Sequence, residues 1–164
     1  MAIQNGWHYV KGPVYGMIWS DISSTATFKA FNPVCVIKGY TVDIAGTSDV
    51  TAIYGIAQND AADSLPGIGA GKTLVLVPTE KTVFSIKVGT GAAASELSIG
   101  QAFDIETSGN YVIGNEDSIT TPFVVVVPRD DWSTIDSADS SVYVNILGNR
   151  LGPIGSNASG AINI

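Results

Sequence analysis

The residues that could carry out catalysis or bind a metal are few in this chain. One histidine, His8, and one cysteine, Cys35, occur among 164 residues. A serine triad needs a histidine base beside its nucleophile, but His8 lies between Trp7 and Tyr9, and no Gly-x-Ser-x-Gly sequence occurs. A zinc site needs three or four ligands, most of them Cys or His. The sequence therefore predicts neither serine catalysis nor a zinc site.

A glycine-rich segment, 67–73, resembles a phosphate-binding loop. The motif requires a further glycine at the position that Pro66 occupies, and it requires a helix immediately afterwards. The following residues, 74–77, are Leu-Val-Leu-Val, which is typical of a strand. A dinucleotide fingerprint fails as well, because its third glycine would be Lys72. We expect a loop that enters a strand, and no cofactor.

Acidic residues leave two alternatives open. Asp104 and Glu106 are two positions apart on an expected strand, so they share one face and could form a hydrolase carboxylate pair. Loop acids could bind calcium, although none has the alternating ligand spacing and turn glycine of a calcium loop. These loop acids are Glu116, Asp117, Asp130, Asp131, Asp136 and Asp139. Solvated acidic loops and an exposed strand face are the favoured interpretations, so no catalytic or metal site is predicted.

Charge is low and uneven. The formal net charge is −7, only 14% of residues are charged, and the mean hydropathy is +0.26; an average domain has roughly 25% charged residues. All of the excess negative charge lies after residue 94, so the chain has no basic stripe for nucleic acid. A surface with so few charges fits one that neighbouring proteins partly cover.

The first residues lack the basic start and apolar stretch of a secretory signal. Cys35 lies in the apolar run 34–37, which predicts a small buried hydrophobe rather than a reactive thiol. The chain is therefore expected to fold in a cytoplasm and to have no membrane partner.

The elements that position these residues are expected to be strands. No window sustains helical periodicity, and short alternating or all-apolar runs are separated by Gly, Pro, Asn, Asp and Ser. The expected strands are 34–38, 41–45, 51–57, 73–77, 83–88, 102–106, 123–127 and 142–147. The fold class predicted is all-β, as a single β-barrel or β-sandwich domain with an extended N-terminal arm and a C-terminal tail.

Turn chemistry adds detail to this fold. Residues 45–49 and 107–110 have lengths and residue types that suit hairpins. Residues 124–127 are four valines, apolar on both faces, which predicts a strand that is central in its sheet or covered by another chain. Pro33, Pro78, Pro122 and Pro128 lie at run edges, where a missing backbone donor costs least.

Three regions are expected: an N-terminal arm over 1–30, a β body over 31–148 and a C-terminal tail over 149–164. The arm is rich in aromatic residues, and the tail carries isolated apolar residues up to Ile164. Both are predicted to pack on the body or on a neighbouring subunit. The residues predicted to make the interface are Trp7, Tyr9, Pro13, Tyr15, Trp19, Ile162 and Ile164.

Several short segments resemble the head decoration, or capsid cement, proteins of tailed bacteriophages. The resemblance covers residues 30–150. The segments are 32–34 (Asn-Pro-Val), 53–59 (Ile-Tyr-Gly-Ile-Ala-Gln-Asn), 82–85, 100–105, 111–113 and 145–150.

The resemblance implies a virion structural protein, made in the host cytoplasm, with no enzymatic activity. It would bind the outside of the capsid and stabilise contacts between major capsid protein subunits, with copies of itself as neighbours in trimers. The alternative is a carbohydrate- or receptor-binding β module on a virion or cell surface, which Trp7, Trp19 and Trp132 would serve by stacking on sugars.

Overall fold

The computed structural model describes residues 6–38, 41–44, 52–89, 98–108, 111–115, 118–119, 121–128 and 141–152. Within these ranges the chain is strands and connections, with one short 3-10 helix at Gly148–Arg150. The strands are β1 (His8–Lys11), β2 (Val14–Ile22), β3 (Pro33–Lys38), β4 (Thr41–Ile44), β5 (Gly55–Ala57), β6 (Ser64–Leu65), β7 (Gly69–Ala70), β8 (Lys72–Pro78), β9 (Val83–Lys87), β10 (Ala102–Ser108), β11 (Tyr111–Asn115), β12 (Val124–Val126) and β13 (Ser141–Ile146). The all-β prediction is confirmed.

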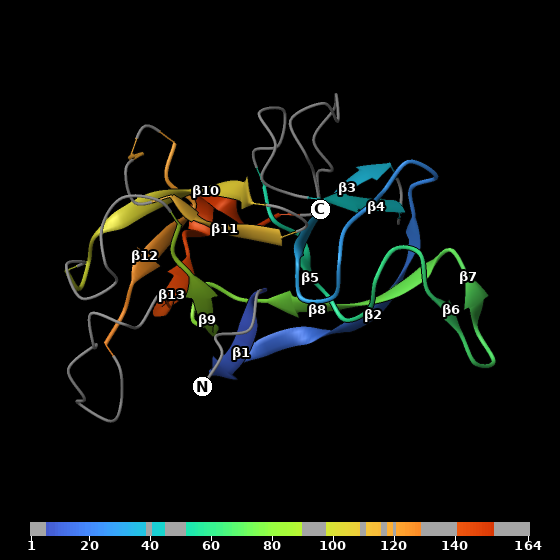
Figure 1. Ribbon diagram of the computed structural model, residues 1–164. Coiled ribbons are helices and arrows are strands. Elements are labelled where there is room, and N and C mark those ends of the chain that lie inside the picture. Colours follow the sequence, from blue (N-terminus) through green and yellow to red (C-terminus); the bar gives the residue numbers. More distant parts are fainter. Residues whose placement is uncertain are drawn as a thin grey trace.

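One group of strands forms a six-stranded antiparallel sheet in the order β1-β9-β13-β12-β10-β11 (Figure 1). The predicted valine strand, β12, lies between β13 and β10, as its two apolar faces require. The far strand, β11, returns to the end of β9, because Val88 and Gly114 form a parallel bridge and the Gly89 amide donates to the Gly114 carbonyl at 2.8 Å.

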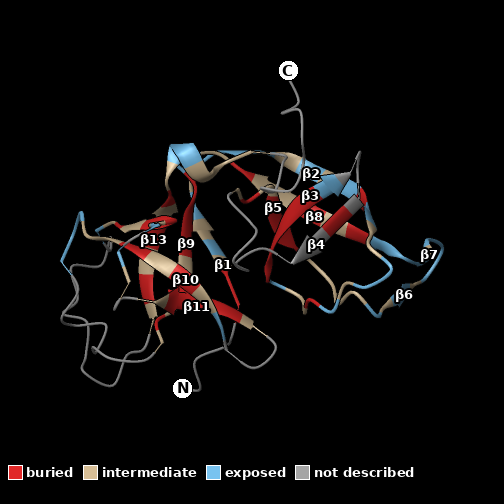
Figure 2. Cartoon of the chain, turned by 90° about the horizontal axis from the view of Figure 1, so that it is seen from above, coloured by how far each residue is buried: buried red, intermediate tan, exposed pale blue. Residues whose placement is uncertain are grey.

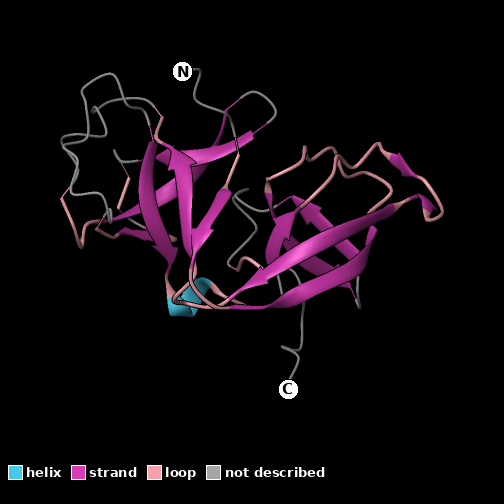
Figure 3. Ribbon diagram, turned by 90° about the horizontal axis from the view of Figure 1, so that it is seen from below, coloured by secondary structure: helices cyan, strands magenta, loops and turns pink. Residues whose placement is uncertain are grey.

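The second group has the order β2-β4-β3-β5-β8, and the pairing returns to its first strand because β2 pairs with both β4 and β8. We call these five strands the five-strand ring. The long strands β2 and β8 run through this group, and a small hairpin, β6-β7, projects from it (Figure 3). The segment after Gly71 is a strand, as predicted, rather than the helix of a phosphate-binding loop.

Two apolar clusters form the core (Figure 2). The larger one joins the two groups, because it unites Cys35, Ile53 and Ile56 with Phe84 and Phe103. The smaller one, around Phe28 and Val75, belongs to the five-strand ring and the segments beside it. Alternation is confirmed in β13 and, from Phe84 onward, in β9, where every second residue is buried, and Cys35 is buried as predicted.

The N-terminal segment differs from the extended arm that the sequence suggests. Within 6–30, β1 pairs with β9 in the six-stranded sheet, and β2 pairs with β8 and β4 in the five-strand ring. The Trp7 amide also donates to the Phe31 carbonyl at 2.7 Å. The strand pairing therefore has no break at the expected boundary near residue 31. Within this segment the sequence shows strand periodicity only over 14–19, which lies in β2, and none over β1, which is why the sequence favours an arm.

One of the two expected hairpins is wrong. The strands on either side of 45–49, β4 and β5, do not pair with each other, because β3 lies between them. Instead β4 pairs with β3, which places Val34 opposite Ile44 and Val36 opposite Val42. The hairpin at 107–110 is confirmed, with Ser108 opposite Tyr111. Loop length suits both turns, but β4 follows β3 directly in the sequence and pairs with it, with the buried Val36 and Val42 opposite each other.

Candidate binding surface

An apolar surface lies on the outward side of β2 and β8. Met17 and Trp19 are two positions apart on β2, so their side chains lie on one face, and each is 47% exposed; Tyr15, in the bulge before Met17, is 77% exposed. Across the strand pair, Leu76 lies opposite Met17 and Leu74 lies opposite Trp19, and both leucines are half-buried. We call these five residues the β2 face.

The backbone beneath the β2 face is held on several sides. Antiparallel pairing with β8 runs from Val14 to Asp21, with a bulge that leaves Tyr15 outside the regular register. The side chains of Asp21 and Lys72 form an ion pair at one end. At the other end the Pro13 carbonyl accepts hydrogen bonds from the Thr82 hydroxyl at 2.6 Å and the Thr79 hydroxyl at 3.1 Å. The exposed side chains therefore project from a constrained strand.

A pocket of about 230 Å³ lies beside this face. Its lining is formed by Trp7, His8, Tyr9, Phe31, Ile56, Gln58, Leu76 and Phe84. Trp7, Ile56 and Phe84 are fully buried, whereas Tyr9 and Phe31 are 48% and 36% exposed. The pocket and the β2 face share Leu76, so the two features adjoin.

Phe31, in the pocket wall, has a backbone φ of 69°, in the left-handed region. A bulky residue adopts this conformation only under constraint from its surroundings. The Phe31 amide donates to the Ala57 carbonyl and its carbonyl accepts from the Trp7 amide, both at 2.7 Å. Its ring centroid lies 4.8 Å from that of His8. These contacts fix the aromatic wall at a local cost in backbone energy.

The residues predicted to form an interface have different environments in the structure. Tyr15 and Trp19 belong to the β2 face, and Pro13 is exposed just before β2 begins. Tyr9 lines the pocket, and its hydroxyl donates to the Gly12 carbonyl at 2.7 Å. Trp7 differs from the expectation, because it is 1% exposed and its indole N–H donates to the Val112 carbonyl at 3.1 Å. Ile162 and Ile164 lie outside the described residues.

Of the candidate acids, the structure describes Asp104 and Glu106 but not those in the loops. Asp104 accepts hydrogen bonds from the Ile105 amide and, at 2.6 Å, from the Thr121 hydroxyl, and neither Asp104 nor Glu106 lines the pocket. The six loop acids considered for calcium, and Trp132, lie outside the described residues. Within the described part of the chain, no group of three or more His, Cys, Asp or Glu side chains is placed to hold a metal ion.

Sequence reasoning missed Met17, Phe31, Gln58 and Leu76. Met17 had a usable signal, since it stands midway between Tyr15 and Trp19 at strand spacing. Phe31 had none, because nothing in its neighbours specifies a left-handed backbone at a non-glycine residue. Gln58 and Leu76 reach the pocket only through the pairing of β5 with β8 and the packing of the two strand groups.

Comparisons with protein-family models, with curated proteins and with solved structures yield no match to this chain. In the described ranges, the structure has no helix of the length and apolarity needed to cross a membrane.

Proposed function

We propose that this chain is a non-enzymatic structural protein that docks its β2 face on another protein. The observation that carries the proposal is the exposure of Tyr15, Met17 and Trp19 along one constrained strand. Contiguous exposed apolar side chains of this kind mark interaction sites, and aromatic residues and methionine are enriched in interfaces. In this proposal the six-stranded sheet and the five-strand ring together form the single barrel or sandwich domain.

The resemblance to head decoration proteins suggests the partner. We propose that the β2 face binds major capsid protein on the outside of a phage capsid, and that neighbouring copies, as trimers, share the site. The protein would then reside in the virion after synthesis in the host cytoplasm. The low charge of the chain supports a surface that is covered in an assembly.

Cosedimentation with capsids tests this proposal. The full chain is mixed with undecorated heads of the phage that encodes it, and bound protein is quantified after pelleting. Met17→Thr and Trp19→Thr keep strand propensity but remove apolar surface, and each should lower the affinity by at least about tenfold. Ile119→Thr, at a residue 69% exposed outside the β2 face, is the matched control and should bind normally.

Wild-type protein that stays in the supernatant would overturn the capsid assignment. Equal binding by wild type, Met17→Thr and Trp19→Thr would overturn the role of the β2 face. Point substitutions are the right probe, because deletion of the first 20 residues removes β1 and most of β2 and so disrupts both strand groups.

A carbohydrate-binding module is the second candidate, and the exposed rings of Tyr15 and Trp19 favour it. Trp7 cannot contribute a stacking surface, because its side chain is buried. Binding to a glycan array that Trp19→Thr abolishes would support this function, and an array without signal would remove it.

A further inference from the structure

The first part of β2 has a neighbouring strand on one side only. Its antiparallel pairing with β8 is regular over 16–21, whereas its parallel pairing with β4 begins only at Asp21. In Figure 1 this part of β2 runs along the lower side of the molecule, with β8 above it. Among the residues that the structure describes, 16–20 thus have no strand on the side away from β8. We call residues 16–20 the β2 edge.

Two hydrogen bonds near the end of β2 show which backbone groups point toward this edge. The Ile22 amide donates to the carbonyl of Gly71, just before β8, and the Ser23 amide donates to a carbonyl of β4, each at 2.9 Å. Successive residues of a strand direct their N–H and C=O groups to opposite sides. Those of Met17 and Trp19 therefore point away from β8, to the side where no described strand receives them. The β2 edge presents two N–H and two C=O groups to an incoming strand.

The β2 edge lacks the features with which soluble proteins usually protect an edge. Those features are lysine and other charged side chains, proline, a bulge or a very short strand. β2 is nine residues long, and its bulge, at Tyr15, precedes the edge. Residues 16–20 are Gly-Met-Ile-Trp-Ser, without charge or proline. A long, apolar and uncharged edge favours the addition of a further strand by main-chain hydrogen bonds.

A second copy of this chain fits the β2 edge in one antiparallel register. With Met17 opposite Trp19 of the second copy, each of the two pairs exchanges two hydrogen bonds, so all the unpaired groups of both edges are used. Pairing Met17 with itself would instead place Trp19 opposite the bulge at Tyr15. Pairing Trp19 with itself would place Met17 opposite Asp21, which already pairs with β4. We propose that two copies of this chain join through their β2 edges, with Met17 opposite Trp19.

The side chains are compatible with this register. Met17 of each copy lies beside Trp19 of the other on the outward face, and contacts between a thioether and an aromatic ring are favourable. Ile18 lies opposite Ile18 at the two-fold axis, and no like charges oppose each other over 16–20. The inference goes beyond the proposed function, because the pairing joins the β2 faces of two copies into one surface. The trimers proposed on the capsid would use other contacts.

Sedimentation equilibrium of the full chain over a range of concentrations tests the pairing. The wild type should reach twice the 17.0 kDa mass of one chain. Met17→Pro removes an N–H that points to the edge, a position where a strand tolerates proline, and Trp19→Lys adds a protective charge. Each should raise the dissociation constant of the dimer by at least about tenfold, with circular dichroism confirming that both variants are folded.

Leu74→Thr is the matched control, because it changes the β2 face without changing the β2 edge. It should alter the dissociation constant by less than about twofold. A wild type that remains monomeric or forms only trimers would overturn the proposal. A loss of the dimer in Leu74→Thr as large as that in the two edge variants would also overturn it, since the copies would then associate through their faces.

Disulfide cross-linking tests the register. In the proposed dimer the two Ile18 residues form a non-hydrogen-bonded pair with Cα atoms about 4.5 Å apart, a separation that a disulfide can span. Oxidised glutathione should therefore convert Ile18→Cys into a covalent dimer, whereas the wild type, whose one cysteine is the buried Cys35, should stay uncross-linked. More efficient cross-linking of Met17→Cys or Trp19→Cys would overturn the register. No covalent dimer from any of the three variants would overturn the pairing and leave the capsid proposal to its own test.

Discussion

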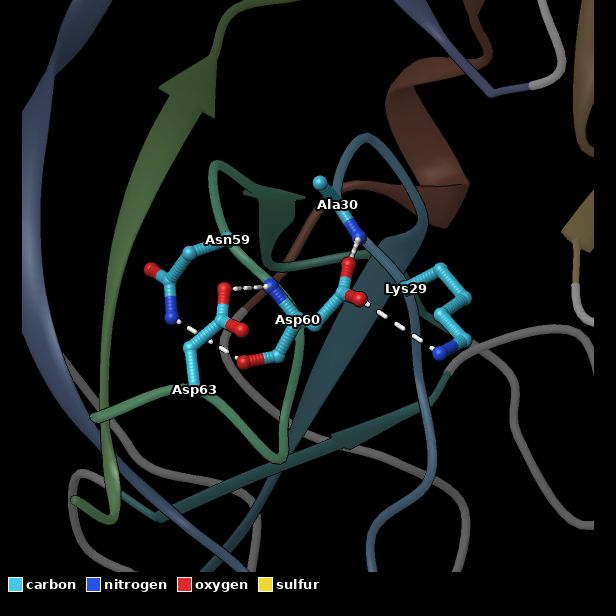
Figure 4. A network of polar contacts seen from close by, with 5 residues as sticks. All are labelled: Lys29, Ala30, Asn59, Asp60 and Asp63. Atoms are coloured by element: carbon cyan, nitrogen blue, oxygen red, sulfur yellow. Dashed lines mark hydrogen bonds and ion pairs between the residues drawn. The ribbon is translucent and has the colours of Figure 1, made fainter. Parts of the chain in front are cut away.

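Asp60 joins two loops of the five-strand ring through its carboxylate. One oxygen accepts a hydrogen bond from the Ala30 amide at 2.7 Å, and the other lies 3.4 Å from the Lys29 ammonium (Figure 4). Its own amide donates to the Asp63 carboxylate at 3.0 Å. Because Lys29 and Asp60 are both more than a third exposed, the ion pair contributes little, and the bond to the backbone amide carries the effect.

Replacement of Asp60 separates the contribution of the hydrogen bond to the Ala30 amide from that of the ion pair with Lys29. Asp60→Ala leaves the Ala30 amide without its acceptor and should lower the free energy of unfolding by about 1–2 kcal/mol. Asp60→Asn keeps an acceptor oxygen and loses only the charge, so it should cost less than about 1 kcal/mol. Urea denaturation measures both. Equal losses in the two variants would show that the charge, rather than the hydrogen bond, is what matters.

Two strand glycines show how the packing of neighbouring strands determines whether a position accepts a side chain. A Cβ on Gly55, in β5, would fall inside contact distance of the Leu76 carbonyl oxygen and the Val75 side chain, whereas a Cβ on Gly16, in β2, meets nothing within 4 Å. Gly55→Ala should therefore lower the free energy of unfolding by about 2–3 kcal/mol. Gly16→Ala should change it by less than about 0.5 kcal/mol. Thermal unfolding monitored by circular dichroism compares them, and comparable stability of the two variants would contradict the close approach of β5 to β8.

At the scale of elements, the sequence predicts strands well and their partners poorly. β9 and β13 alternate apolar and polar residues because one face is buried, and β12 is apolar throughout because it is central. For β2 the sequence shows periodicity over 14–19, but it shows neither the continuation of the strand to Ile22 nor its pairing with β8 and β4. β3 and β4 are consecutive strands, so their pairing is local, whereas the pairing of β4 with β2 is non-local information that no single run contains.

The candidate surface was predictable only in part, because it too depends on contacts between distant segments of the chain. Tyr15 and Trp19 could be chosen as exposed aromatic residues, but the buried state of Trp7 depends on the approach of β11, which lies about a hundred residues later in the chain. The pocket is created where the two strand groups meet. Its lining comes from several separate segments, and only their relative position makes them neighbours.

At the scale of the whole molecule, both backbone groups of Val112, in β11, form hydrogen bonds with side chains from the N-terminal part of the chain. Its amide donates to the Asn32 side-chain oxygen at 3.0 Å, and its carbonyl accepts from the Trp7 indole at 3.1 Å. Asn32 precedes the ring strand β3, whereas β11 is an edge of the six-stranded sheet. Side chains thus satisfy a buried edge that would otherwise lack partners, and they tie the two strand groups together.

This connection, together with the apolar cluster shared by both groups, makes one cooperative unfolding transition the expected behaviour. Asn32→Ala leaves the Val112 amide buried and unpaired, so it should lower the free energy of unfolding by about 1–3 kcal/mol. Because the two groups unfold together, the midpoints measured by tryptophan fluorescence and by far-ultraviolet circular dichroism should fall equally, with an unchanged denaturant slope. Ser64→Ala, on the projecting β6-β7 hairpin, should leave both midpoints in place. Two separate transitions in the wild type, or a shift of only one probe in Asn32→Ala, would mean that the strand groups are independently stable.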